Sequence, residues 1–123
     1  MSAVSTLAVT FTVPMPGLEG AAGFTLRGVD GATGLFVLEA SAGTAARLFV
    51  ADAGVYVPGY TPPIPAPAVE AGQTTTLLVV NPGSGKPTVN LAAPLLLNPE
   101  TGTCTQLLLD SNAYSLRAEL GGA

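Results

Sequence analysis

The chain has 123 residues, of which 10% are charged, and its eight acidic and four basic side chains give a formal net charge of −4. This length suits one small domain that buries roughly two-thirds of its unfolded surface, so we expect a single domain over residues 1–123. The four cations stand singly in the sequence. Phosphate-backbone binding needs clustered Lys and Arg, so we expect no direct nucleic-acid binding. Because the net charge is negative, we expect the protein to associate more readily with basic partners.

The sequence predicts that the protein is located in the cytoplasm. Residues 91–97 form the longest apolar run in the C-terminal half and include a proline, whereas a membrane helix needs about 20 apolar residues. The first seven residues carry no Lys or Arg, unlike a secretory leader. The one cysteine, Cys104, has no intrachain partner, which fits a reducing compartment. We therefore expect no membrane span and no export.

The first half of the chain shows strand periodicity. Apolar residues alternate with small or polar ones from Leu7 to Val13, with positions 7, 9, 11 and 13 on one face, and Pro14 ends the run. Residues 35–39 and 47–51 form two further strand-like runs joined by small residues, which predicts an antiparallel pair. Residues 55–57 give one more brief β-rich run.

The second half begins with a proline-rich segment. Five prolines in residues 58–67 rule out a central strand there, and we expect Pro62-Pro63-Ile64-Pro65 to cover a sheet edge rather than to serve as a ligand for an aromatic groove. Strand-like runs then follow at 74–81, 88–98, 104–109 and 114–120, separated by turn residues. The sequence thus predicts an all-β protein, a small single-domain antiparallel β-barrel or barrel-like sandwich.

Residues that carry catalysis are scarce. The chain has no histidine, which removes the commonest general base and the commonest zinc ligand. Cys104 stands between two threonines at the start of an apolar run and is expected to be a buried, inert thiol. No pair of carboxylates stands out by spacing, and no acidic loop typical of calcium sites is present. We expect no enzymatic activity, no cofactor and no metal.

One segment imitates a phosphate-binding loop. Gly85-Lys86 is followed by a hydroxyl residue at Thr88, but Val80 occupies the position where the motif requires its first glycine. Such a loop must also open a helix, whereas Thr88-Val89 begins a strand-like run. We interpret the segment as an ordinary turn.

The stretch 88–120 carries a specific polar pattern. Asn90 precedes an apolar run, Asn98 opens a turn, Gln106 leads a Leu-rich run, and Tyr114 and Arg117 follow near the end. This order resembles the signature of the flagellar assembly factor FliW family. Upstream, the Met-Pro-Gly-Leu turn at 15–18, the strand-like residues Phe24 and 35–38, and Pro-Gly-Tyr at 58–60 are similar to that family in the same order.

The resemblance implies a non-enzymatic function that depends on protein binding. Members of the family bind flagellin in the cytoplasm and also bind the RNA-binding regulator CsrA, so that flagellin and CsrA compete for one pool of the factor. It therefore implies a flagellar assembly factor, acting as a monomer, that antagonises CsrA by direct protein contact. The alternative from another class is a self-associating structural β-barrel subunit without a regulatory switch.

The resemblance also singles out five residues for partner binding: Tyr60, Asn90, Asn98, Gln106 and Arg117. Each has a structural alternative. The two asparagines suit turns, where their side chains bind local backbone groups; Gln106 must find partners if it is buried; Tyr60 can pack beneath its own loop. Tyr114 and Arg117, three apart on a terminal strand, are expected to face opposite sides, with Arg117 the better candidate for contact.

The loop at 61–73 departs from the family, because relatives carry a longer, more acidic and partly helical segment where this chain is proline-rich and nearly uncharged. This difference bears on whether CsrA binding is kept. From the remaining charges, we expect reversal of Asp52 and Glu70 together to weaken binding to a basic partner and to flatten its salt dependence.

Overall fold

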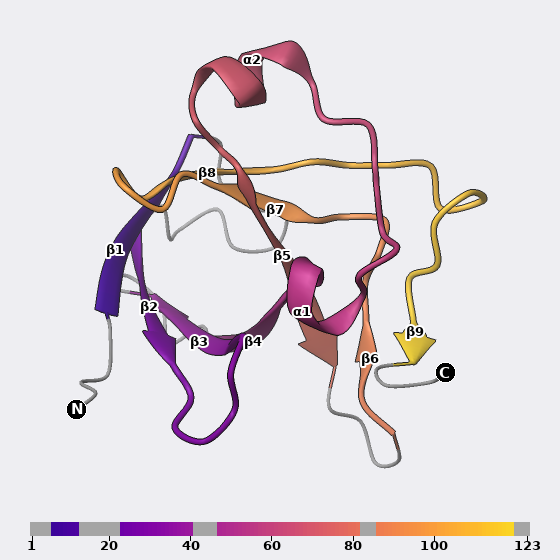
Figure 1. Ribbon diagram of the computed structural model, residues 1–123, viewed down its shortest axis with the longest axis horizontal. Helices are drawn as coiled ribbons and strands as arrows, with labels where there is room; N and C mark the ends of the chain where they lie inside the picture. The colour runs from indigo at the N-terminus through magenta and orange to yellow at the C-terminus, as the bar shows by residue number, and fades with distance from the viewer. Residues whose placement is uncertain (1–5, 13–22, 41–46, 82–85, 120–123) are drawn as a thin grey trace.

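The computed structural model describes residues 6–12, 23–40, 47–81 and 86–119, and these form one nine-stranded sheet with two short helices (Figure 1). In chain order the elements are β1 (Thr6–Phe11), β2 (Gly23–Gly28), β3 (Leu35–Ala40), β4 (Arg47–Asp52), α1 (Ala53–Tyr56), α2 (Ala66–Glu70), β5 (Thr75–Asn81), β6 (Thr88–Val89), β7 (Leu95–Leu97), β8 (Thr103–Gln106) and β9 (Ala118–Glu119).

Seven of the strands close into a barrel. β1 to β5 pair consecutively and antiparallel, β5 pairs with β7, and β7 pairs with β8. The ring is closed by β8 lying parallel to β1, with Thr10 opposite Thr103 and Phe11 opposite Cys104. Backbone bonds from Thr10 N to Gly102 O (2.9 Å) and from Thr12 N to Cys104 O (3.0 Å) hold this seam. The all-β barrel prediction is confirmed, with one parallel pair where only antiparallel pairs were expected.

The barrel interior is filled by the alternating apolar residues of its strands. On β1, Val9 and Phe11 are buried while Thr6, Ala8 and Thr10 face solvent, as the alternation predicts. The rings of Phe11 and Phe24 pack edge-to-face, with their centroids 5.3 Å apart. The buried core contains Val9, Phe11, Phe24, Leu26, Leu38, Val50, Leu77, Leu95, Leu97 and Cys104. The predicted pair 35–39 and 47–51 is confirmed as β3 and β4.

Two strands extend the sheet beyond the barrel. β6 pairs with the end of β5, and β9 pairs with β6, with Val89 opposite Ala118. The run 88–98, expected as one strand, is therefore two strands that both pair with β5, because the segment 90–94 between them leaves the sheet. The run 114–120 was also wrong as a strand: within its described part only Ala118–Glu119 is extended and paired, and Tyr114 lies in a turn.

Of the run 55–57, Val55 and Tyr56 are helical rather than extended, and Val57 is the C-cap of α1. Asp52 ends β4 and its Oδ1 accepts a hydrogen bond from Gly54 N at 2.9 Å, which caps the first turn of α1. An aspartate in this position satisfies an amide that has no partner within the helix, and this outweighs the strand propensity of Val55 and Tyr56.

The end of the proline-rich segment, from Pro65 into α2, lies on an outer face of the barrel rather than at a sheet edge. Pro65 is the N-cap residue of α2, and α2 lies above β7 and β8 in Figure 1. Ala68 is buried. It lines a hollow together with Leu96 and Thr105, whose side chains point outward from β7 and β8. Because the barrel is closed here, the segment covers an outer face, and Gln73 Nε2 fixes it by donating to Thr105 Oγ1 at 3.2 Å.

Candidate partner-binding surface

Tyr60 lies half-buried in the loop after α1. Its hydroxyl donates a 2.5 Å hydrogen bond to the carbonyl of Leu91, and its ring meets the ring of Tyr114 edge-on at 6.0 Å. Burial, reinforced by the neighbouring phenol of Tyr114, raises the pKa of Tyr60 to about 12. The phenol thus stays neutral and acts as a donor, which is the packed alternative that the sequence allowed.

Of the five predicted residues, Tyr60 belongs to this aromatic pair, and Asn90 and Arg117 lie beside it. Asn90 follows β6, and its Oδ1 accepts a hydrogen bond from Ala92 N at 2.9 Å. Leu91 N bonds Ser115 O at 2.8 Å, and Arg117 N bonds Ser115 Oγ at 3.1 Å, so the segment before β9 lies beside the segment after β6. We name Tyr60, Asn90, Tyr114, Leu116 and Arg117 the tyrosine cluster.

Within this cluster the exposed side chains are those of Leu116, 56% exposed, and Arg117. Arg117 precedes β9 in a bend, so the expectation that it and Tyr114 share one strand does not hold. An exposed apolar side chain beside an exposed guanidinium is a pattern typical of protein contact surfaces, where Arg and apolar groups are enriched. Arg117 remains a candidate for contact.

Asn98 lies elsewhere, at the turn between β7 and β8. Its Oδ1 accepts from Glu100 N (2.8 Å) and Thr101 N (3.1 Å), and its Nδ2 donates to Ala71 O (2.8 Å). These three bonds shape the turn and tie it to the end of α2. These hydrogen bonds give the Asn98 side chain a structural role, and its role in partner binding remains a prediction.

Gln106 ends β8 opposite Leu95, on the inner face at the barrel end away from Asn98. Its Oε1 is buried and has no hydrogen-bond partner within the described residues. The sequence expectation that this amide would either find partners or lie exposed is not met for this oxygen. The structure thus separates Gln106 and Asn98 from the tyrosine cluster.

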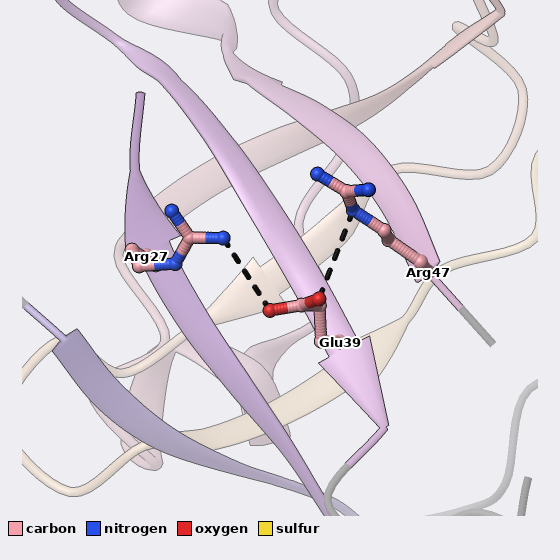
Figure 2. Close-up of polar contacts among 3 residues, drawn as sticks. All are labelled: Arg27, Glu39 and Arg47. Carbon is pink, nitrogen blue, oxygen red and sulfur yellow. Dashed lines mark hydrogen bonds and ion pairs between the residues drawn. The ribbon is translucent and has the colours of Figure 1, made fainter. Parts of the chain in front are cut away.

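A second charged surface was not predicted from the sequence. On the outer face of β2, β3 and β4, Glu39 lies between two arginines, with its Oε1 3.5 Å from Arg27 Nη2 and its Oε2 3.7 Å from Arg47 Nε (Figure 2). Arg47 also lies 5.7 Å from the ring centre of Phe49. The cations look isolated in sequence, but strand register places Arg27, Glu39 and Arg47 side by side. The signal that could have found part of this group was the predicted antiparallel pair of residues 35–39 and 47–51, whose register places Glu39 opposite Arg47.

Chemistry-bearing groups are few in the described part of the chain. Cys104 is buried at the barrel seam, as expected, and burial raises the pKa of its thiol to about 12; that the thiol is inert remains a prediction. The described residues contain no group of three potential metal ligands. No helix in these ranges has the length and apolar character needed to cross a membrane. The glycine turn at 83–85, Val13 and the turn at 15–18 lie outside the described residues, while Thr88–Val89 is extended, as expected.

Asp52 has a structural role in addition to its charge. Because it caps α1, reversing its charge would disturb the helix as well as the surface potential, whereas Glu70 is exposed at the end of α2. The combined reversal expected from sequence is therefore not a clean test of electrostatics.

Comparison with known proteins agrees with the fold. The model of the FliW protein family matches residues 2–120. The crystal structure of the flagellar assembly factor FliW superimposes with a TM-score of 0.75 at 20% sequence identity, covering 91% of this chain and 84% of that one. No curated protein matches the chain. Since the family match spans nearly all residues and the barrel is shared, this chain belongs to the FliW protein family.

Proposed function

We propose that this protein is a non-enzymatic flagellar assembly factor that binds flagellin in the cytoplasm and antagonises CsrA by direct protein contact. The observation that carries the proposal is the family match over residues 2–120. The shared barrel supports the same scaffold, although at 20% identity it supports the fold alone.

The described chemistry supports stoichiometric binding. The chain lacks histidine, and the thiol of Cys104 is buried with a raised pKa. The tyrosine cluster instead offers exposed Leu116 and Arg117 next to a region fixed by hydrogen bonds. Such a preformed patch loses little conformational entropy on binding, which favours affinity.

The test is calorimetric titration of the purified chain with flagellin and, separately, with CsrA from the same genome. Saturable binding to both, with one partner blocking the other, is the expected result. Absence of binding to either at high micromolar concentration would contradict the proposal. Light scattering completes the test, because we expect a monomer and the structural-subunit alternative requires a stable oligomer.

Arg117→Ala tests the tyrosine cluster, and Lys86→Ala is its matched control. Both side chains are exposed, and neither forms an ion pair with the described residues. We expect Arg117→Ala to weaken at least one of the two interactions by about fivefold or more, in the range of an interface arginine, and Lys86→Ala to leave both unchanged. Equal effects of the two variants would remove Arg117 from the contact surface.

A further inference from the structure

One end of the barrel is an apolar cup. The starts of β1, β3 and β5 meet there with the ends of β2, β4 and β7, and a hollow of about 480 Å³ opens between them. Its apolar wall belongs to the inner face of the barrel and consists of Leu7, Leu26, Phe36, Leu77 and Leu97. Leu7 and Phe36 are only partly buried, so among the described residues these two apolar side chains of the core remain partly accessible to solvent at this end.

The size and place of the cup fit a binding site. Ligand sites in proteins occupy about 300–1,000 Å³, are mostly apolar with a few polar groups, and often lie in the mouths of β-barrels. Partly exposed Leu and Phe side chains in water also forgo the favourable burial that the rest of this core obtains. Since the cup is open at the rim, it suits side chains that project from a partner segment.

The charge of the rim selects the partner. Of the described residues that line the cup, Asp52 is the one that carries a charge, and Thr6 and Thr75 provide hydroxyl groups beside it. The backbone amide of Gly54 fixes Oδ1 of Asp52 at 2.9 Å, so the carboxylate is held in place without a cation. No Lys or Arg of the described ranges forms an ion pair with it. A cationic group of a partner therefore meets a preoriented acceptor.

We propose that this barrel mouth binds a basic amphipathic peptide segment, whose Leu-like or Phe-like side chains enter the cup while a neighbouring Lys or Arg pairs with Asp52. The apolar wall provides most of the affinity, and the single carboxylate provides the preference for a cation over an anion. This site adjoins the tyrosine cluster, because Asp52 and Thr75 of the cup line a neighbouring hollow together with Tyr60, and it does not depend on the identity of the partners proposed above.

The test uses two capped hexapeptides, GLLKLG and GLLELG, titrated into the isotope-labelled protein and followed by backbone amide shifts. We expect GLLKLG to shift the amides of residues 7, 36, 77 and 97 saturably and to bind about two- to fivefold more tightly than GLLELG, the range of one exposed charge pair. Equal affinity of the two peptides, shifts elsewhere, or no shifts would overturn the proposal.

Two matched variant pairs complete the experiment. Asp52→Asn keeps an oxygen for Gly54 N and removes the charge, whereas Asp110→Asn does the same at a distant turn where Oδ1 accepts from Asn112 N at 2.9 Å. We expect only Asp52→Asn to abolish the preference for GLLKLG. Likewise, Phe36→Ser at the cup is expected to weaken both peptides, and Phe49→Ser on the outer face is not. Retained preference in Asp52→Asn would contradict the proposal even if Phe36→Ser failed to fold.

Discussion

The hydroxyl of Tyr60 is bonded to the carbonyl of Leu91, 31 residues further along the chain, at 2.5 Å. This bond connects the loop after α1 to the segment that leaves β6, and the edge-on ring of Tyr114 adds the turn before β9. Three segments without regular structure are thus held together by one side chain.

Replacing Tyr60 by Phe tests this connection. The variant keeps the ring but leaves the carbonyl of Leu91 without its donor, so we expect the free energy of unfolding to fall by about 1–2 kcal/mol. Urea denaturation measures this loss. Tyr56→Phe is the control, because Tyr56 also donates to a carbonyl, that of Thr33 at 3.0 Å, but at an exposed site where water can replace it. An equal loss in both variants would contradict a special role for Tyr60.

The buried thiol of Cys104 predicts a loss of stability at alkaline pH. Its pKa is raised from 9.0 to about 12, so between these values the folded chain binds more protons than the unfolded chain. The resulting contribution to stability is complete below about pH 9 and is lost as pH rises towards 12. Cys104→Ala removes this contribution, so the stability difference between wild type and variant should shrink between pH 8 and about pH 11. A difference independent of pH in urea denaturation would argue against it.

Gly102 permits the close approach of the β7–β8 turn to β1. Its φ is +81°, and a Cβ atom there would stand 1.9 Å from the carbonyl oxygen of Ala8. We expect Gly102→Ala to cost several kcal/mol or to prevent folding, because backbone must move. Gly31 has a similar φ of +77° with nothing within 4 Å, so Gly31→Ala should cost only about 1–2 kcal/mol. Comparable thermal unfolding of the two variants would show that the seam yields more easily than its geometry implies.

Variants of Asn98 distinguish a structural role of this side chain from a role in partner binding. Asn98→Asp keeps the acceptor for Glu100 N and Thr101 N but cannot donate to Ala71 O, whereas Asn98→Ala loses all three bonds. We expect Asn98→Ala to lower the free energy of unfolding by about 1–3 kcal/mol and Asn98→Asp by less. If the role of this residue is purely structural, the folded variants will show the same affinity as the wild type in the flagellin titration proposed above. A loss of affinity in the more stable Asn98→Asp would restore the partner-binding interpretation.

Local patterns predicted much of the barrel. The alternation through Val9 and Phe11 identified the buried face of β1, and the paired runs around Val37 and Phe49 identified β3 and β4, because each signal lies within a few residues. The helix at 53–56 was missed because Asp52 was considered only as a charge, although an aspartate before a short turn is also a helix N-cap signal.

The candidate sites were less accessible to sequence reasoning. The bond between Tyr60 and Leu91, the position of Glu39 between two arginines and the cup at the barrel mouth all depend on contacts across strands. Such contacts follow from register and closure, which the order of residues does not reveal. The five residues indicated by the family resemblance accordingly lie in three separate places.

The parallel seam between β1 and β8 has a kinetic consequence. Thr10 finds its partner at Thr103, so the barrel cannot close until residues far apart in the chain have met, and the entropy of that loop is lost before the contact is gained. We therefore expect slow folding on the scale of β-proteins, in the millisecond-to-second range. A chain shortened before residue 103 would keep every strand pairing from β1 to β5 and still be unable to close its ring.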